Sequence, residues 1–164
     1  MKVQVRARMR QSLDWGAALW GGIISGALVF TLNIILSWIF LGSPWVLVRL
    51  TASILLGANA LPPPAGFDLA IFLAALLVQM ALSLFYGLLV AIVIFRWGLL
   101  VGFLGGAALG LAIYAINFFA ISYFVPWFFP LRSWILLLSH ALFGALAGGI
   151  YELLEEEEFV PVKD

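Results

Sequence analysis

The chain has 164 residues, of which 65% are hydrophobic and only 10% charged, and its mean hydropathy is +1.18. An ordinary globular domain is about 45–50% apolar and 25% charged, so this composition excludes a typical soluble fold. The formal net charge is zero and the basic residues form no patch, which argues against nucleic acid as a partner. The absence of cysteine excludes disulfides and thiolate-bound metals.

Long uncharged stretches organise the rest of the chain. Between Asp14 and Glu152 the only charged residues are Arg49, Asp68, Arg96 and Arg132. The stretches that they separate include four that reach the roughly 20 apolar residues needed to cross a membrane. We therefore predict an all-α, single-domain membrane helix bundle with transmembrane helices at residues 15–40, 69–95, 97–124 and 133–154. The first stretch exceeds the apolar core of a cleavable signal peptide, about 7–15 residues, so we interpret it as a retained span.

A loop on the outer side, residues 41–68, joins the first two spans and contains a short predicted helix. Pro44 stands in a first-turn position and Gly57 ends the apolar run. About 12 residues extend only some 18 Å, so this helix is expected to lie at the interface or to re-enter the membrane. Arg49 is expected to extend toward the lipid headgroups. A fifth full span would place Arg96 on the outer side, which the charge distribution disfavours.

The distribution of lysine and arginine predicts the orientation, because these residues accumulate on the cytoplasmic side. With four spans and the amino end inside, only Arg49 and Arg132 face outward, whereas the other six basic residues face inward. Both termini are therefore predicted to be cytoplasmic, in a bacterial inner membrane.

The terminal segments are a basic arm, residues 1–14, and an acidic tail, residues 155–164. The arm alternates basic and other residues with the period of an extended strand. Glutamates at the carboxyl end of a helix oppose its dipole. The tail is therefore predicted either to be solvated or to be stabilised by the basic arm or by a partner's basic surface.

The two halves of the sequence share a pattern that suggests a two-fold internal repeat. Corresponding residues are Gly21, Gly22, Gly26 and Asn33 with Gly105, Gly106, Gly110 and Asn117, and more weakly Phe85-Tyr86-Gly87 with Leu142-Phe143-Gly144. The first and third spans run in the same direction, so the repeat would be parallel about an axis along the membrane normal. The alternative is a chance match between glycine- and leucine-rich segments.

Small residues four positions apart form stripes on three of the predicted spans. The stripes are Gly22 and Gly26 on the first span, Gly98, Gly102, Gly106 and Gly110 on the third, and Ala141, Ala145 and Gly149 on the fourth. In lipid, helices associate where such residues let their backbones approach closely. The stripes are therefore predicted to pack helices, either within the bundle or against another integral membrane protein.

Each span also carries one candidate polar side chain: Asn33, Gln79, Asn117 and His140. At 1.5 Å per residue all four fall on the outer side of their span midpoints, so we predict that they share one layer. Other residues that could join this layer are Thr31, Ser37, Ser83, Tyr114, Tyr123 and Ser139. Such groups either form hydrogen bonds between helices or mark a binding site, and the sequence leaves both possibilities open.

No pattern in the chain indicates catalysis. His140 is the only histidine, and no acidic residue lies within a span at its depth, so neither a metal site nor a proton relay is predicted. The spans hold no carboxylate pair, no nucleophile beside a base and no phosphate-binding glycine loop. We therefore predict no catalytic, cofactor-binding or metal-binding residue.

Several short motifs resemble those of a loose group of small bacterial four-span membrane proteins of uncharacterised function. The motifs are Pro44-Trp45 with Leu50, Asn117-Phe118-Phe119, Val125-Pro126-Trp127-Phe128, and His140 with Gly144. The resemblance covers most of the predicted membrane part but neither charged tail. It implies the four-span fold and no particular activity, and it assigns no functional residue.

The sequence thus predicts a protein that acts by binding. The leading hypothesis is a non-catalytic accessory or structural subunit of a larger inner-membrane assembly, such as an electron-transfer complex of the respiratory type. Its partners would be membrane lipids and other integral membrane subunits. The alternative is a small oligomeric transporter, or a membrane protein that binds a lipid or small molecule, with the polar layer as an outward-facing site.

Overall fold

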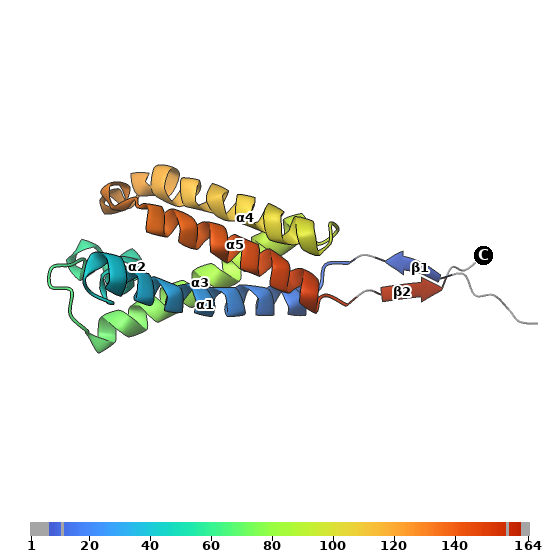
Figure 1. Ribbon diagram of the computed structural model, residues 1–164, viewed down its shortest axis with the longest axis horizontal. Coiled ribbons are helices and arrows are strands. Elements are labelled where there is room, and N and C mark those ends of the chain that lie inside the picture. Colours follow the sequence, from blue (N-terminus) through green and yellow to red (C-terminus); the bar gives the residue numbers. More distant parts are fainter. Residues whose placement is uncertain (1–6, 11, 157, 162–164) are drawn as a thin grey trace, which may run out of the picture.

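The computed structural model describes residues 7–10, 12–156 and 158–161. Four long helices form an elongated bundle, with short helical segments at one end and a pair of strands at the other (Figure 1). The long helices are α1 (Trp15–Leu41), α3 (Leu69–Ile94), α4 (Leu99–Ala115) and α5 (Trp134–Leu154). The other elements are β1 (Ala7–Arg10), α2 (Val46–Leu56), η1 (Ala58–Ala60), η2 (Ile116–Ala120), η3 (Ile121–Tyr123), η4 (Pro126–Leu131) and β2 (Glu158–Pro161).

Four segments are long and apolar enough to cross a membrane, which confirms the predicted multi-pass helix bundle. Their bounds lie within two residues of the predicted ones. The third span, Leu99–Tyr123, differs in kind from the prediction, because α-helical geometry ends at Ala115 and continues as the π-helix η2 and the 3₁₀ turn η3. The apolar helix α2 has 11 residues and is too short to cross.

Helix ends fall where the sequence supplies capping groups. Asp14, Asp68 and Ser133 precede α1, α3 and α5, and each side chain accepts a hydrogen bond from the backbone N–H three residues later, at 3.0 to 3.3 Å. Gly42 and Gly57 end α1 and α2 with φ angles of 76° and 78°, which favour glycine. Asp14 and Asp68, which delimit apolar stretches in the sequence, therefore begin helices.

The two ends of the described chain are joined beyond the bundle. β1 pairs with β2 in antiparallel register, with Arg10 opposite Glu158, so residues 7–10 of the basic arm lie along residues 158–161 of the acidic tail (Figure 1). The outer parts of the arm and the tail, 1–6 and 162–164, lie outside the described residues. The Asp14 backbone N–H donates to the Tyr151 hydroxyl at 3.3 Å, and the Asp14 carboxylate accepts from the Glu156 N–H at 3.4 Å. We call this the tail end of the bundle, and the opposite end, with α2 and η4, the loop end.

The helices approach each other most closely at glycines in two pairs, α1 with α3 and α4 with α5, which we call the two hairpins. A Cβ atom added at Gly22 would lie 2.6 Å from the Ser83 carbonyl oxygen, and one at Gly87 would lie 2.5 Å from the Gly22 Cα. In α4–α5, a Cβ at Gly106 or at Gly144 would collide with the carbonyl oxygen of the other glycine. The backbones therefore approach as closely as small-residue packing in membranes allows.

The glycine contacts of the two hairpins correspond to one another in the predicted internal repeat. The corresponding contacts are Gly22–Gly87 with Gly106–Gly144, and Gly26–Ser83 with Gly110–His140. Corresponding positions thus lie at both helix crossings, although Gly26 meets the Ser83 side chain and Gly110 meets the His140 carbonyl oxygen. This agreement supports a duplicated two-helix unit.

Part of the predicted packing stripe is wrong. Gly98 packs against nothing, because it begins α4 with a φ angle of 76° and a Cβ there would meet no atom within 4 Å. Among the glycines of α5, the closest contacts are made by Gly144 and Gly148, whereas the predicted Ala145 and Gly149 are both buried beside them. A Cβ at Gly149 would make only an ordinary 3.4 Å contact with a phenylalanine ring. Two stripes with equal spacing lie side by side on α5, and spacing alone does not choose between them.

Arg49 also departs from the prediction, because it is only 7% exposed and does not extend outward. Its Nε donates to the Gly66 carbonyl at 3.0 Å and its Nη1 to the Ala60 carbonyl at 3.4 Å. The connection between α2 and α3 contains irregular backbone whose carbonyl groups need donors. Arg49 therefore fastens this connection to α2.

Three buried apolar clusters form the core. One lies between the helices around Tyr151 and Ile94, a second joins α2 to α1 and α3 around Ala75, and a third joins α2 to η2 and α5 around Phe118. Many large apolar side chains on the outer faces are exposed, as expected for surfaces that contact lipid.

Gly144→Ala is expected to destabilise the bundle by about 1–3 kcal/mol, because the added methyl group must force α4 and α5 apart. Gly105→Ala is the matched control, since its Cβ would meet nothing closer than 3.8 Å. Thermal unfolding in detergent micelles measures both. Equal midpoints for the two variants would contradict the proposed contact.

Arg49→Met is expected to lower the free energy of unfolding by about 2 kcal/mol or more, because two carbonyl groups lose their donor. Arg132→Met serves as the control, since Arg132 is exposed and water can replace its 2.7 Å bond to the Phe129 carbonyl. Limited proteolysis between α2 and α3 should accelerate only in the Arg49 variant. If Arg49 only contacted lipid headgroups, the two variants would be cleaved at the same rate.

Candidate binding cavity

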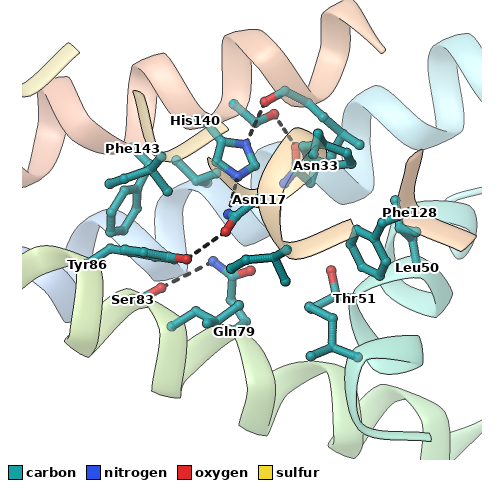
Figure 2. A pocket seen from close by; sticks show the side chains of 18 of the residues that line it. Asn33, Leu50, Thr51, Gln79, Ser83, Tyr86, Asn117, Phe128, His140 and Phe143 are labelled. Carbon is teal, nitrogen blue, oxygen red and sulfur yellow. Dashed lines mark hydrogen bonds between the residues drawn. The ribbon is translucent and has the colours of Figure 1, made fainter. Parts of the chain in front are cut away.

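A cavity of about 240 Å³ lies in the loop half of the bundle, between the two hairpins. Its wall is mainly apolar, with polar side chains from all four spans and from α2 (Figure 2). The lining residues are Val29, Asn33, Leu50, Thr51, Ile54, Gln79, Leu82, Ser83, Tyr86, Ile113, Asn117, Phe118, Ile121, Val125, Phe128, Leu136, Ser139, His140 and Phe143. An apolar wall with a few converging polar groups is typical of a small-molecule site.

The structure brings all four predicted polar residues to this cavity. Asn33 comes from α1, Gln79 from α3, Asn117 from η2 and His140 from α5 (Figure 2). Of the further candidates, Ser83 and Ser139 line the cavity, whereas Thr31, Ser37, Tyr114 and Tyr123 do not. One polar side chain from each span therefore lines the same cavity, and two of them, Asn117 and His140, are in direct contact.

Tyr86, Asn117 and His140 form a hydrogen-bonded chain whose direction the backbone determines. His140 Nδ1 lies 2.7 Å from the Leu136 carbonyl oxygen, which can only accept, so Nδ1 carries the proton. No carboxylate lines the cavity to stabilise an imidazolium, so Nε2 is an unprotonated acceptor. Asn117 Nδ2 donates to this Nε2 at 3.3 Å, and Asn117 Oδ1 accepts from the Tyr86 hydroxyl at 2.7 Å.

Gln79 is oriented in the same way by a backbone carbonyl. Its Nε2 donates to the Gly26 carbonyl at 3.3 Å and to the Ser83 hydroxyl at 3.2 Å. The opposite orientation of the amide would place two acceptors against each other. The close approach of Gly26 to Ser83 therefore fixes Gln79, and its Oε1 points away from Ser83 (Figure 2).

Asn33 reaches across to the other hairpin, where the Ser139 hydroxyl lies 2.5 Å from its Oδ1. The same hydroxyl lies 2.8 Å from the Ile135 carbonyl. No backbone carbonyl fixes the orientation of the Asn33 amide, in contrast to Gln79. Asn33 can therefore present either a donor or an acceptor to the cavity.

The backbone of the third span changes geometry beside the cavity. Residues 116–120 form the π-helix η2, which contains Asn117 and the buried Phe118. The corresponding residues of the repeat, 32–36, lie inside the regular helix α1. Non-α backbone at membrane depth is tolerated where it is buried or lines a cavity, and π-turns often mark functional sites. The second copy of the repeat thus departs from the first at the cavity itself.

The loop end closes over the cavity through a contact between η4 and α2. Trp127 Nε1 donates to the Ser53 hydroxyl at 3.3 Å, and Phe128 borders the cavity. The only lining side chains that are exposed are Ile54 and Ile121, at 42% and 41%. The lining thus reaches the surface at two apolar side chains, one near the end of α2 and one in η3, and we take these as the mouth of the cavity.

The lining contains no charged side chain, and the nearby Arg49 is engaged with the α2–α3 connection. Within residues 7–10, 12–156 and 158–161, no group of three histidine, cysteine or acidic residues could hold a metal ion. The cavity can therefore orient a ligand through neutral hydrogen bonds and apolar contacts.

Tyr86 and Thr51 also line the cavity, although neither is among the predicted polar residues. Gln79, Ser83 and Tyr86 are spaced at i, i+4 and i+7, which places them on one face of α3 and could have indicated Tyr86. Thr51 has no such signal, because the sequence does not show which helices α2 packs against.

The single histidine allows a direct test of the hydrogen-bond chain. In protein labelled with ¹⁵N-histidine near neutral pH, His140 is expected to show a protonated Nδ1 and an unprotonated Nε2. Asn117→Leu should perturb the Nε2 resonance most, and Tyr114→Phe, outside the cavity, should leave it unchanged. A protonated Nε2 would contradict the direction derived above.

Comparison with protein-family models, with curated proteins and with solved structures finds no match. The resemblance to small bacterial four-span proteins therefore stays a prediction. The cavity itself provides the argument for function.

Proposed function

We propose that this protein binds a small uncharged amphiphile in the membrane and acts by holding or transferring it, without catalysis. The observation that carries the proposal is the convergence of Asn33, Gln79, Asn117 and His140 on one cavity. Hydrogen bonds between neighbouring helices would satisfy such residues in pairs and would not require a cavity among them. The change to π geometry at η2 supports the same site independently.

The chemistry of the wall supports an uncharged ligand. A charge in a low-dielectric site needs an opposite charge or a metal, and the lining supplies neither. The apolar mouth at Ile54 and Ile121 suits a molecule that enters from lipid.

The positive-inside rule supports an orientation with the tail end in the cytoplasm of a bacterial inner membrane. In that orientation the loop end, with the cavity and its mouth, belongs to the outer half of the bilayer. The ligand would then be drawn from the outer leaflet.

An accessory subunit of a larger inner-membrane assembly, for example an electron-transfer complex, is the second proposal. Its specific support is the aromatic surface beside η3, where Tyr123 and Phe124 are 84% and 80% exposed. The glycine stripes do not favour this proposal, because most of their glycines contact another helix of the same chain. Purification of the natively expressed protein solely as a homo-oligomer would exclude this proposal.

Thr51→Trp tests the binding proposal by filling the cavity from α2. Protein released from nanodiscs made with cell-derived lipids is expected to carry a bound molecule of lipid mass, detected by native mass spectrometry. The variant should lose that mass, because the indole ring occupies the space.

Leu55→Trp is the matched control. Leu55 lies on the same helix, is 57% exposed and does not line the cavity, so the bound mass should persist. Equal binding by both variants would show that the lipid sits elsewhere on the surface and would refute the proposal.

A further inference from the structure

Three side chains that line the cavity already donate all of their polar hydrogens within the protein. Tyr86 gives its only hydroxyl proton to Asn117, and Gln79 directs its amide hydrogens to Gly26 and Ser83. Thr51 gives its proton to the Leu47 carbonyl at 3.0 Å. The Tyr86 Oη, the Gln79 Oε1 and the Thr51 Oγ1 thus retain lone pairs but have no proton to offer.

These three acceptors belong to two neighbouring helices that both line the cavity. Gln79 and Tyr86 are two helical turns apart on one face of α3, and Thr51 faces them from α2 (Figure 2). An acceptor that faces an apolar cavity gains from a ligand that supplies the missing donor. The site is therefore complementary to a ligand that donates hydrogen bonds.

We infer that the ligand is a lipid alcohol, an uncharged amphiphile whose hydroxyl headgroup donates to Gln79 Oε1 or Tyr86 Oη. This inference rests on the proposed function and specifies its ligand class. A ketone, ester or ether only accepts hydrogen bonds and would leave the same oxygens unpaired. A hydroxyl group also accepts, so it can pair with the Asn33 amide in either orientation.

Charged headgroups fit the cavity less well. An ammonium group would donate to these acceptors, but the lining holds no carboxylate to balance its charge. A carboxylate headgroup would bring its negative charge against the lone pairs of these oxygens, which repel it. The apolar tail of a lipid alcohol can leave through the mouth between Ile54 and Ile121, where both side chains are exposed.

A competition experiment tests this inference. The protein in nanodiscs is labelled by a hexadecanol analogue with a photoreactive diazirine in its chain, and the labelled peptides are identified by mass spectrometry. Unlabelled hexadecanol, hexadecyl methyl ether, methyl palmitate and palmitate are the competitors. We expect labelling near the mouth, with hexadecanol competing about tenfold or more better than the ether and the ester. Palmitate should also compete more weakly than hexadecanol.

Tyr86→Phe and Tyr114→Phe form a matched pair of variants. Both remove one phenol hydroxyl, but Tyr114 does not line the cavity, and the contacts of its ring with Phe118 and His140 are kept by phenylalanine. The Tyr86 variant is expected to reduce the preference for hexadecanol over its methyl ether severalfold. The Tyr114 variant should preserve it, and this comparison separates a role in recognition from a general effect on folding.

The outcomes distinguish the inference from the function on which it rests. Labelling near the mouth with equal competition by alcohol, ether and ester would overturn the lipid-alcohol inference and leave the binding cavity intact. Stronger competition by palmitate would overturn it as well. Labelling that Thr51→Trp does not reduce would refute both the inference and the proposed function.

Discussion

Backbone contact at glycine is the interaction on which this fold depends. Gly22 against Gly87 and Gly106 against Gly144 bring the helices of each hairpin together toward the tail half. Beyond these contacts the lining side chains are larger, from Val29 to Phe118 and Phe128, and they enclose a cavity instead of filling it. Close packing and the cavity thus have one cause: the small residues are concentrated toward the tail half, and larger side chains stand toward the loop half.

The same contacts determine the chemistry of the cavity. The Ser83 side chain can approach Gly26 only because that residue has no side chain, and the approach places the Gly26 carbonyl within reach of Gln79. The carbonyl of Leu136, one turn before His140, performs the equivalent task for the imidazole. Two main-chain oxygens therefore decide which atoms of the polar side chains remain available to a ligand.

Much of the fold could be predicted from hydropathy alone, because each span is long, apolar and bounded by a charge or a cap such as Asp68. The shared layer of Asn33, Gln79, Asn117 and His140 followed from their depths. The rotation of each helix about its axis did not, so the stripe on α5 was placed one residue away from Gly144 and Gly148.

The sequence also does not predict which distant residues a single side chain such as Arg49 will contact. Arg49 was expected at the headgroups because nothing in the sequence indicates that the Gly66 and Ala60 carbonyls come within its reach. The π geometry of η2 has no sequence signal comparable to proline or glycine. The repeat predicts the opposite, because Asn117 corresponds to Asn33, which lies in the regular helix α1.

The pairing of β1 with β2 has a consequence for biosynthesis. β1 precedes the first span, whereas its partner strand follows the last one, so the ribosome must complete α5 before the strands can meet. The hydrogen bonds from Asp14 to residues of α5 and beyond share this delay. Insertion of the first helices and closure of the bundle at the tail end are therefore separate events, and closure comes last.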